Sequence, residues 1–222
     1  MAEINPNRKN DEKQEKIINS YLLEKYFCKI MPNAELVFDT DLQVAGADVS
    51  VELSNGRTTY FDIKAQSSAK YINDPRPTFC LEVSSLNRYG EEFEGWFIND
   101  ELITDYYTFV WIHEAKTNSQ NRIVSPNDIY KLEVMTVSKK KLKKYILAQL
   151  GNTDIDKVVR IMRDGGKRRL DISDGIHFSH SPQLHEKPVN IIVKKSVLKK
   201  FALKKFGHCY VFPNKISEFP IW

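Results

Sequence analysis

The chain has 222 residues and a formal net charge of +4, with 41% hydrophobic, 11% aromatic and 28% charged residues. This composition is that of a soluble globular protein with a substantial core, and no apolar run approaches the length of a membrane-spanning helix. Three widely spaced cysteines form neither a disulfide framework nor a zinc pattern, and the polar opening is not a signal peptide. We therefore expect a cytoplasmic protein without membrane contact.

The charge is unevenly distributed along the chain. Residues 1–138 carry 14 basic and 22 acidic side chains, whereas residues 139–222 carry 19 basic and 7 acidic ones. A basic surface favours a polyanionic partner, although lysine-rich helices also occur without one. We expect an α/β core in 1–138 and a basic, mostly helical extension in 139–222, packed on the core or continuous with it.

The first predicted element is a helix from about residue 10 to residue 29. Its apolar face consists of Ile17, Ile18, Tyr21, Leu22 and Tyr26. Glu15 precedes Leu22 by seven residues, so it lies at the edge of this face and can reach a sheet below it. Glu12 lies further round toward solvent and is the alternative.

A predicted edge strand at 35–39 leads into a predicted β-hairpin around Asn55-Gly56. In its second strand, apolar residues at 61, 63 and 65 alternate with Asp62, Lys64 and Gln66. A three-residue loop, Ser54–Gly56, places Val49 opposite Phe61, which buries one apolar face. The same register places Asp48 opposite Asp62.

Two adjacent carboxylates repel each other unless they share a cation. Oxygen ligands suit Mg²⁺ or Mn²⁺, and a lysine beside the metal can orient a water molecule or help to deprotonate it. Asp39 and Asp41 are alternatives for the role of Asp48, but they precede a loop instead of alternating with core residues.

The order Asp48, hairpin, Asp62-Ile63-Lys64 resembles the signature of the PD-(D/E)xK nuclease superfamily, with Ala47 where that signature usually has proline. The resemblance implies a restriction-endonuclease-like core, a central mixed β-sheet flanked by helices. It also implies that Asp48 and Asp62 hold Mg²⁺, that Lys64 positions the attacking water, and that Gln66 orients the water or the phosphate. Many members place a glutamate of the first helix on the metal, and Glu15 is the matching residue here.

Downstream residues extend this resemblance, over roughly the first half of the chain, to small bacterial and phage members. A strand is predicted at 78–83, and it is followed by Gly95-Trp-Phe97. Glu82 on this strand is a candidate for a further metal ligand, with a partner of Lys64 and an ordinary exposed strand residue as the alternatives. The aromatic and β-branched run at 102–112 predicts a buried strand, and 131–137 adds another. Between these strands, residues 85–97 predict a loop in which Arg88 can contact a sugar-phosphate backbone.

The basic part predicts three helices, at 139–150, 154–164 and 196–206, and a final strand at 208–212. The residues expected to contact phosphates are Arg88, Lys167, Arg168, Arg169, Lys199, Lys200 and Lys204. His177, His180 and His185 have no spacing typical of a zinc site.

We expect a Mg²⁺- or Mn²⁺-dependent endonuclease that hydrolyses phosphodiester bonds in DNA, and a homodimer remains open. Two alternatives are a nucleic-acid-binding protein that keeps the fold without cutting, and a protein-interaction module in which the carboxylates and lysine form a row of surface ion pairs.

Overall fold

The computed structural model describes residues 6–151 and 153–219, with side chains from residue 11 onward. The chain forms two compact units. Unit 1 takes in the described parts of Met1–Arg76, Ile103–Ser138 and Ala202–Trp222, and unit 2 takes in those of Pro77–Leu102 and Lys139–Phe201. The chain thus passes between the units four times, and one of these passages is at the predicted boundary after Ser138.

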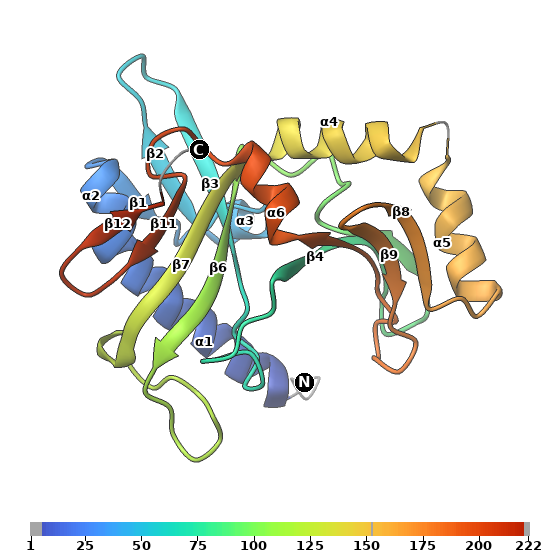
Figure 1. The fold of residues 1–222 in the computed structure, drawn as a ribbon, viewed down its shortest axis with the longest axis horizontal. Helices are drawn as coiled ribbons and strands as arrows, with labels where there is room; N and C mark the ends of the chain where they lie inside the picture. The colour runs from blue at the N-terminus through green and yellow to red at the C-terminus, as the bar shows by residue number, and fades with distance from the viewer. Residues whose placement is uncertain (1–5, 152, 220–222) are drawn as a thin grey trace. The chain divides into compact units, whose positions relative to one another are not determined.

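Unit 1 is built on a curled, mixed sheet of seven strands (Figure 1). In spatial order these are β1 (Ala34–Leu36), β2 (Val49–Glu52), β3 (Thr58–Ala65), β6 (Tyr106–Ala115), β7 (Ile129–Ser138), β11 (His208–Val211) and β12 (Ile216–Glu218). Only the β3–β6 pair is parallel within this sheet. The strands predicted for this part of the chain are confirmed, and so is the mixed sheet.

A helical run covers one face of this sheet (Figure 1). It consists of α1 (Pro6–Leu22), a π-helical turn η1 (Leu23–Phe27) and α2 (Cys28–Ile30), which confirms the predicted helix. Ile18 and Leu22 are fully buried in one core with Val110 and Val134 of the sheet. Because successive side chains alternate along a strand, Asp62 points to the face of the sheet opposite the one that these helices cover. Two shorter helices complete unit 1, α3 (Thr40–Val44) and the 3₁₀ turn η2 (Pro126–Asp128).

The hairpin adopts the predicted register. Val49 pairs with Phe61 and Glu52 with Thr58, and Leu53 N donates to Arg57 O at 2.9 Å, which leaves a three-residue loop. Gly56 closes this loop with a φ of +78°, a conformation that side-chain-bearing residues rarely adopt. Burying Val49, Val51, Phe61 and Ile63 on one side therefore selects the register, as expected.

Unit 2 contains an antiparallel sheet of five strands and the remaining helices of the described residues. The strands are, in order, β5 (Glu92–Glu94), β4 (Thr78–Leu86), β10 (Val189–Lys194), β9 (Ile176–His180) and β8 (Arg169–Ser173). The helices are α4 (Lys139–Leu150), α5 (Ile155–Asp164), α6 (Lys195–Leu198) and the 3₁₀ turn η3 (Lys199–Phe201). Helices α4 and α5 confirm two predicted elements.

The prediction of a mostly helical C-terminal part is wrong. Five strands, β8 to β12, lie in residues 139–222, and the protein is an α/β protein that is mainly β. The physical reason is a period of two: Ile176 and Phe178 are buried on one strand, and Val189, Ile191 and Val193 on the next.

Two further elements differ from the prediction. The helix expected at 196–206 is limited to α6 and η3, because Ala202 forms a β-bridge with Val137 and Phe206 has a positive φ of 53°. The loop expected at 85–97 contains the end of β4 and the whole of β5. Among the described residues, no helix has the length and apolar character needed to span a bilayer.

Candidate active site

The candidate site lies where β2 and β3 enter the unit 1 sheet. The regular pairing stops at Val49 and Phe61. Beyond it, Asp48 N donates to Phe61 O at 2.9 Å, and the Asp48 carboxylate Oδ2 accepts a hydrogen bond from Ile63 N at 2.6 Å. The carboxylate thus accepts the Ile63 N–H, and the predicted pairing of Asp48 with Asp62 is not formed.

Asp62 is the most buried member of the site. Its residue is 3% exposed, and its Oδ1 forms an ion pair of 2.8 Å with Lys64 Nζ. Its other oxygen, Oδ2, is buried without a hydrogen-bond partner among the described residues. A buried carboxylate oxygen without a partner is costly and rare, so this atom requires an explanation.

Burial and mutual repulsion shift the acidities of this site. Burial and, to a smaller extent, repulsion by Asp62 raise the pKa of Asp48 to about 7, although the Ile63 N–H and Lys64 oppose this shift. Glu15 retains exposed surface, yet crowding by the protein around its carboxylate raises its pKa, with Lys64 opposing and Asp62 adding to the shift. Burial alone would lower the pKa of Lys64, but the three carboxylates outweigh it and raise this pKa.

Three carboxylates and one ammonium group therefore share one electrostatic environment, which we name the Asp62 cluster: Glu15, Asp48, Asp62 and Lys64. The helix residue that the sequence singled out, Glu15, acts on both Asp48 and Lys64. The cluster bears more negative than positive charge when all its members are ionised.

The Asp62 cluster offers carboxylate oxygens to a hard divalent cation, but it does not form a group of three protein ligands. Asp62 Oδ2 is a buried oxygen without a partner, and Asp48 is a second carboxylate beside it. No three His, Cys, Asp or Glu side chains within residues 6–151 and 153–219 are arranged as a metal-binding group. Mg²⁺ in proteins is often held by one or two carboxylates, with water and substrate oxygens completing its shell, and a two-carboxylate site meets that requirement.

One predicted site residue is engaged in other contacts. The Gln66 amide donates from Nε2 to Arg76 O at 3.1 Å and accepts at Oε1 from Arg76 N at 2.8 Å, so it ties two backbone segments together. Glu82 lies on β4, in the sheet of unit 2. The alternative acid Asp39 caps α3 by accepting from Asp41 N and Leu42 N.

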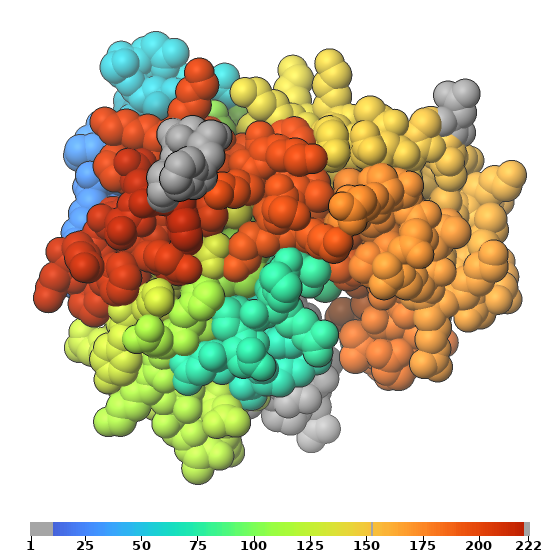
Figure 2. Space-filling view, in the orientation of Figure 1, coloured from blue at the N-terminus to red at the C-terminus, as the bar shows by residue number. Residues whose placement is uncertain are grey.

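The residues expected to contact phosphates are all exposed, and they are divided between the units. Lys204 belongs to unit 1, and the others belong to unit 2: Arg88, Lys167, Arg168, Arg169, Lys199 and Lys200. Arg169 forms an ion pair of 2.6 Å with Asp171. The segment around residue 200, drawn in orange-red, forms part of the face seen in Figure 2.

A second buried polar group was not predicted, and we name it the Glu133 cluster. Glu133 on β7 is 3% exposed, and its two oxygens lie 2.8 Å from His113 Nε2 and 2.9 Å from His208 Nε2. His113 occupies an irregularity in the β6–β7 pairing, which is the usual device for redirecting a strand side chain. The ring of His208 stacks on Phe219 with centroids 4.0 Å apart.

The three histidines that drew attention in the sequence do not form a site. His177 and His180 lie on β9 three residues apart, so they point to opposite faces. His180 is buried, its Nδ1 lies 3.1 Å from Met162 O, and burial lowers its pKa. His185 is exposed.

Comparison of the chain with family models, with curated proteins and with solved structures gives no match. The features of the chain that point to a function are the geometry of the Asp62 cluster and the order of its residues along the chain.

Proposed function

We propose that the protein is a metal-dependent nuclease of the PD-(D/E)xK kind, which hydrolyses phosphodiester bonds in DNA. The observation that supports this most directly is the buried Asp62 oxygen without a hydrogen-bond partner, next to Asp48 and Lys64 on a hairpin of the expected register. A fold gains nothing from gathering three carboxylates around one lysine unless a further positive charge is bound.

In this proposal Asp48 and Asp62 hold the cation, and Glu15 contributes charge from the helix side. A divalent cation, when bound, supplies Lewis-acid stabilisation of the phosphate and lowers the pKa of a coordinated water. Lys64 orients the attacking water and offsets the charge that develops on the phosphate oxygens. The raised pKa of Asp48 means that its carboxyl must release a proton before it can serve as a ligand near neutral pH.

Phosphate contacts come in this proposal from exposed basic side chains such as Lys199, Lys200 and Lys204. Such contacts supply affinity without sequence information and weaken with added salt. Gln66 is left out of the proposed chemistry, because its amide is bound to the Arg76 backbone. Glu82 is given no role in it.

Cleavage of supercoiled plasmid by the purified protein in Mg²⁺ or Mn²⁺ tests the proposal. Asp62→Asn and Lys64→Met should each reduce cleavage by about 100-fold or more, as removal of one transition-state contact commonly does. Asp74→Asn and Lys116→Met are matched controls, because both residues are exposed and lie outside the cluster. Intact plasmid with the wild-type protein in both metals would refute the nuclease proposal, as would cleavage that persists in EDTA.

One observation favours a second candidate, a nucleic-acid-binding protein that does not cut. Lys64 occupies one oxygen of Asp62, and no three-residue ligand group is formed among the described side chains. In that case the protein would shift DNA in a gel in a salt-sensitive manner, and neither Asp62→Asn nor added metal would alter the shift.

A further inference from the structure

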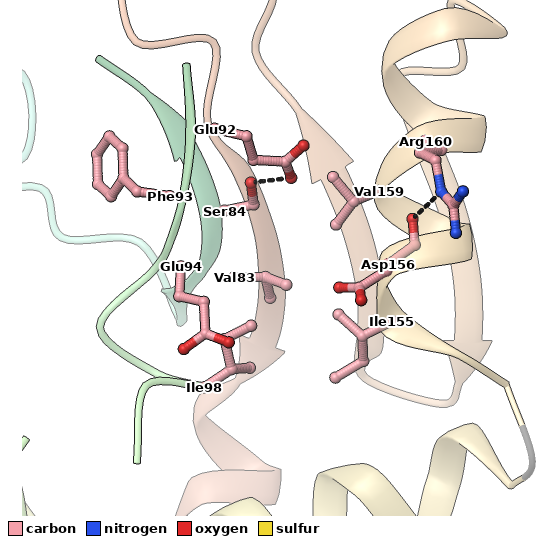
Figure 3. Close-up of a pocket in the computed structure, with 10 residues that line it drawn as sticks. All are labelled: Val83, Ser84, Glu92, Phe93, Glu94, Ile98, Ile155, Asp156, Val159 and Arg160. Carbon is pink, nitrogen blue, oxygen red and sulfur yellow. Dashed lines mark hydrogen bonds between the residues drawn. The ribbon is translucent and has the colours of Figure 1, made fainter. Parts of the chain in front are cut away.

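Unit 2 contains a pocket that the proposed nuclease chemistry does not use. It has a volume of about 420 Å³ and lies between α5 and the β4–β5 edge of the five-stranded sheet (Figure 3). This volume is in the range of pockets that bind small organic ligands. The residues that line it are Val83, Ser84, Glu92, Phe93, Glu94, Ile98, Ile155, Asp156, Val159 and Arg160.

The pocket has an apolar floor. Val83 is fully buried and Val159 is 2% exposed, and the half-buried Ile98 and Ile155 extend this apolar surface. Apolar atoms that line a pocket favour a ligand with methylene or ring carbon, because contact removes both surfaces from water.

Two carboxylates stand above this floor, one from each wall. Glu94 is on the edge strand β5 and Asp156 is in the first turn of α5, and Figure 3 shows both turned toward the space between them. Among the described residues, neither carboxylate has an ion-pair or hydrogen-bond partner for its side chain. Both groups are thus available to a ligand, and they define a negative site over an apolar surface.

The other charged groups of the lining do not neutralise these two. Glu92 is already bound, since its Oε1 accepts from Ser84 Oγ at 2.6 Å and pairs with Arg163 at 2.7 Å. Arg160 donates from Nε to the Asp156 backbone carbonyl at 3.3 Å, and its guanidinium lies away from the Glu94 carboxylate (Figure 3).

Backbone contacts hold the strand that carries Glu94 in place. Glu94 pairs with Ser84 across β4 and β5, and Gly95 N donates to Val83 O at 2.8 Å. A side chain at Gly95 would place its Cβ 2.4 Å from the Glu82 backbone, so only glycine permits this close approach. The Glu94 carboxylate therefore stands on a well-defined strand.

We propose that this pocket binds an organic cation: an ammonium or guanidinium group on an apolar stem. The stem would lie on Val83, Ile98, Ile155 and Val159, and the charged group would be held between Glu94 and Asp156, as long basic side chains combine apolar and ionic contacts. Such a group is carried by a free amine or by a lysine or arginine side chain of a protein partner. A phosphate would be repelled here, so the pocket is distinct from any surface that contacts a nucleic-acid backbone.

Calorimetric titration of the full chain at low salt tests the proposal, with cadaverine and agmatine as free cations and a short lysine-containing peptide as the protein-like probe. We expect saturable binding of at least one probe, weakened about fivefold or more in Glu94→Gln and in Asp156→Asn, which corresponds to about 1 kcal/mol. Glu186→Gln and Asp164→Asn are matched controls on exposed carboxylates outside the lining, and binding should be unchanged in them.

The free cations and the peptide distinguish the two possible sources of the cationic group. Tighter binding of the diamine or agmatine assigns the pocket to a small molecule, and tighter binding of the peptide assigns it to a protein partner. Absence of saturable binding of all three probes up to about 10 mM would overturn the proposal, because a weaker interaction would be no more than charge attraction. Equal weakening in pocket and control variants would overturn it too.

Discussion

Two buried carboxylates of unit 1, Asp62 and Glu133, are each 3% exposed, yet the protein surrounds them in opposite ways. Both oxygens of Glu133 are paired with histidine Nε2 atoms, at 2.8 and 2.9 Å. His208 Nδ1 is buried without a hydrogen-bond partner, which favours the tautomer that carries its proton on Nε2, where Glu133 accepts it. Asp62 has one oxygen on Lys64 and one buried oxygen without a partner among the described residues.

The difference separates a structural role from a functional one. A carboxylate whose oxygens are both paired stabilises the sheet that holds it, and the Glu133 cluster joins β6, β7 and β11 in this way. The Asp62 cluster instead carries unfavourable electrostatic energy, seen in the raised pKa values of Asp48 and Glu15. Residues that destabilise a fold are typically retained where they bind or react.

The largest expected effect on stability is that of Glu133→Gln. Glutamine offers one acceptor and one donor, so one of the two histidine N–H groups loses its acceptor, and we expect a loss of about 3 kcal/mol in the free energy of unfolding. Asp62→Asn should change this free energy by less than about 1 kcal/mol, because it also relieves repulsion. Urea unfolding of both variants at pH 7 measures the contrast. Equal losses in the two variants would remove the distinction between the clusters.

A divalent cation should stabilise the protein through the Asp62 cluster alone. With Mg²⁺ or Mn²⁺ at about 30 times its dissociation constant, the free energy of unfolding should rise by about 2 kcal/mol. Asp62→Asn should abolish this rise. His113→Asn, which alters the Glu133 cluster at its partly exposed histidine, should retain it. Thermal unfolding with and without metal gives the result, and a rise that survives in Asp62→Asn would assign the cation to another site.

Asp48→Asn should stabilise the protein at high pH and not at low pH. The folded-state pKa of Asp48, about 7, lies above its unfolded value, so the folded chain retains a proton that the unfolded chain loses. This group therefore makes the wild type less stable as pH rises from about 4 to about 7. Since Asp48 is partly solvated, we expect a gain of about 1–2 kcal/mol in Asp48→Asn at pH 8 and almost none near pH 4. Urea unfolding at the two pH values decides, and a gain of equal size at both would exclude proton linkage as its cause.

The Asp62 cluster could be predicted because its residues lie on locally determined elements. Alternation along 49–65 and a glycine in the loop fix the register of the hairpin, and the helical spacing of seven between Glu15 and Leu22 places Glu15 at the edge of the apolar face. The direction of the Asp48 carboxylate could not be predicted in this way, because it bonds to Ile63 N only where the regular ladder ends.

The Glu133 cluster could not be predicted from local pattern. Glu133 is 20 residues from His113 and 75 residues from His208, and strand pairing alone brings the three together. The one available indication was an acid inside the otherwise apolar run Leu132–Met135, because a buried charge needs a partner. In the same way, β8, β9 and β10 were not predicted, because the basic surplus of residues 139–222 favoured a helical interpretation, whereas the alternation of Val189, Ile191 and Val193 decides the structure.

The smallest expected effect concerns which helix acid belongs to the Asp62 cluster. Burial, with help from Asp62, raises the pKa of Glu15, so Glu15→Gln should stabilise the protein above that pKa and have no effect below the unfolded value. Because Glu15 keeps exposed surface, the gain at pH 8 should be less than about 0.5 kcal/mol.

Glu12→Gln is the matched control one helical turn away. Comparing the Mg²⁺ affinity of the two variants tests which of the two glutamates belongs to the cluster. If Glu15 adds charge to the site, Glu15→Gln should lower the affinity for Mg²⁺ by about threefold, and Glu12→Gln should leave it nearly unchanged, since ionic contacts weaken steeply with distance and solvation. Titration of metal-dependent stability in the two variants makes the comparison. Equal affinities in both variants would confine the site to the two strand carboxylates, and a larger loss in Glu12→Gln would assign the helix contribution to Glu12 instead.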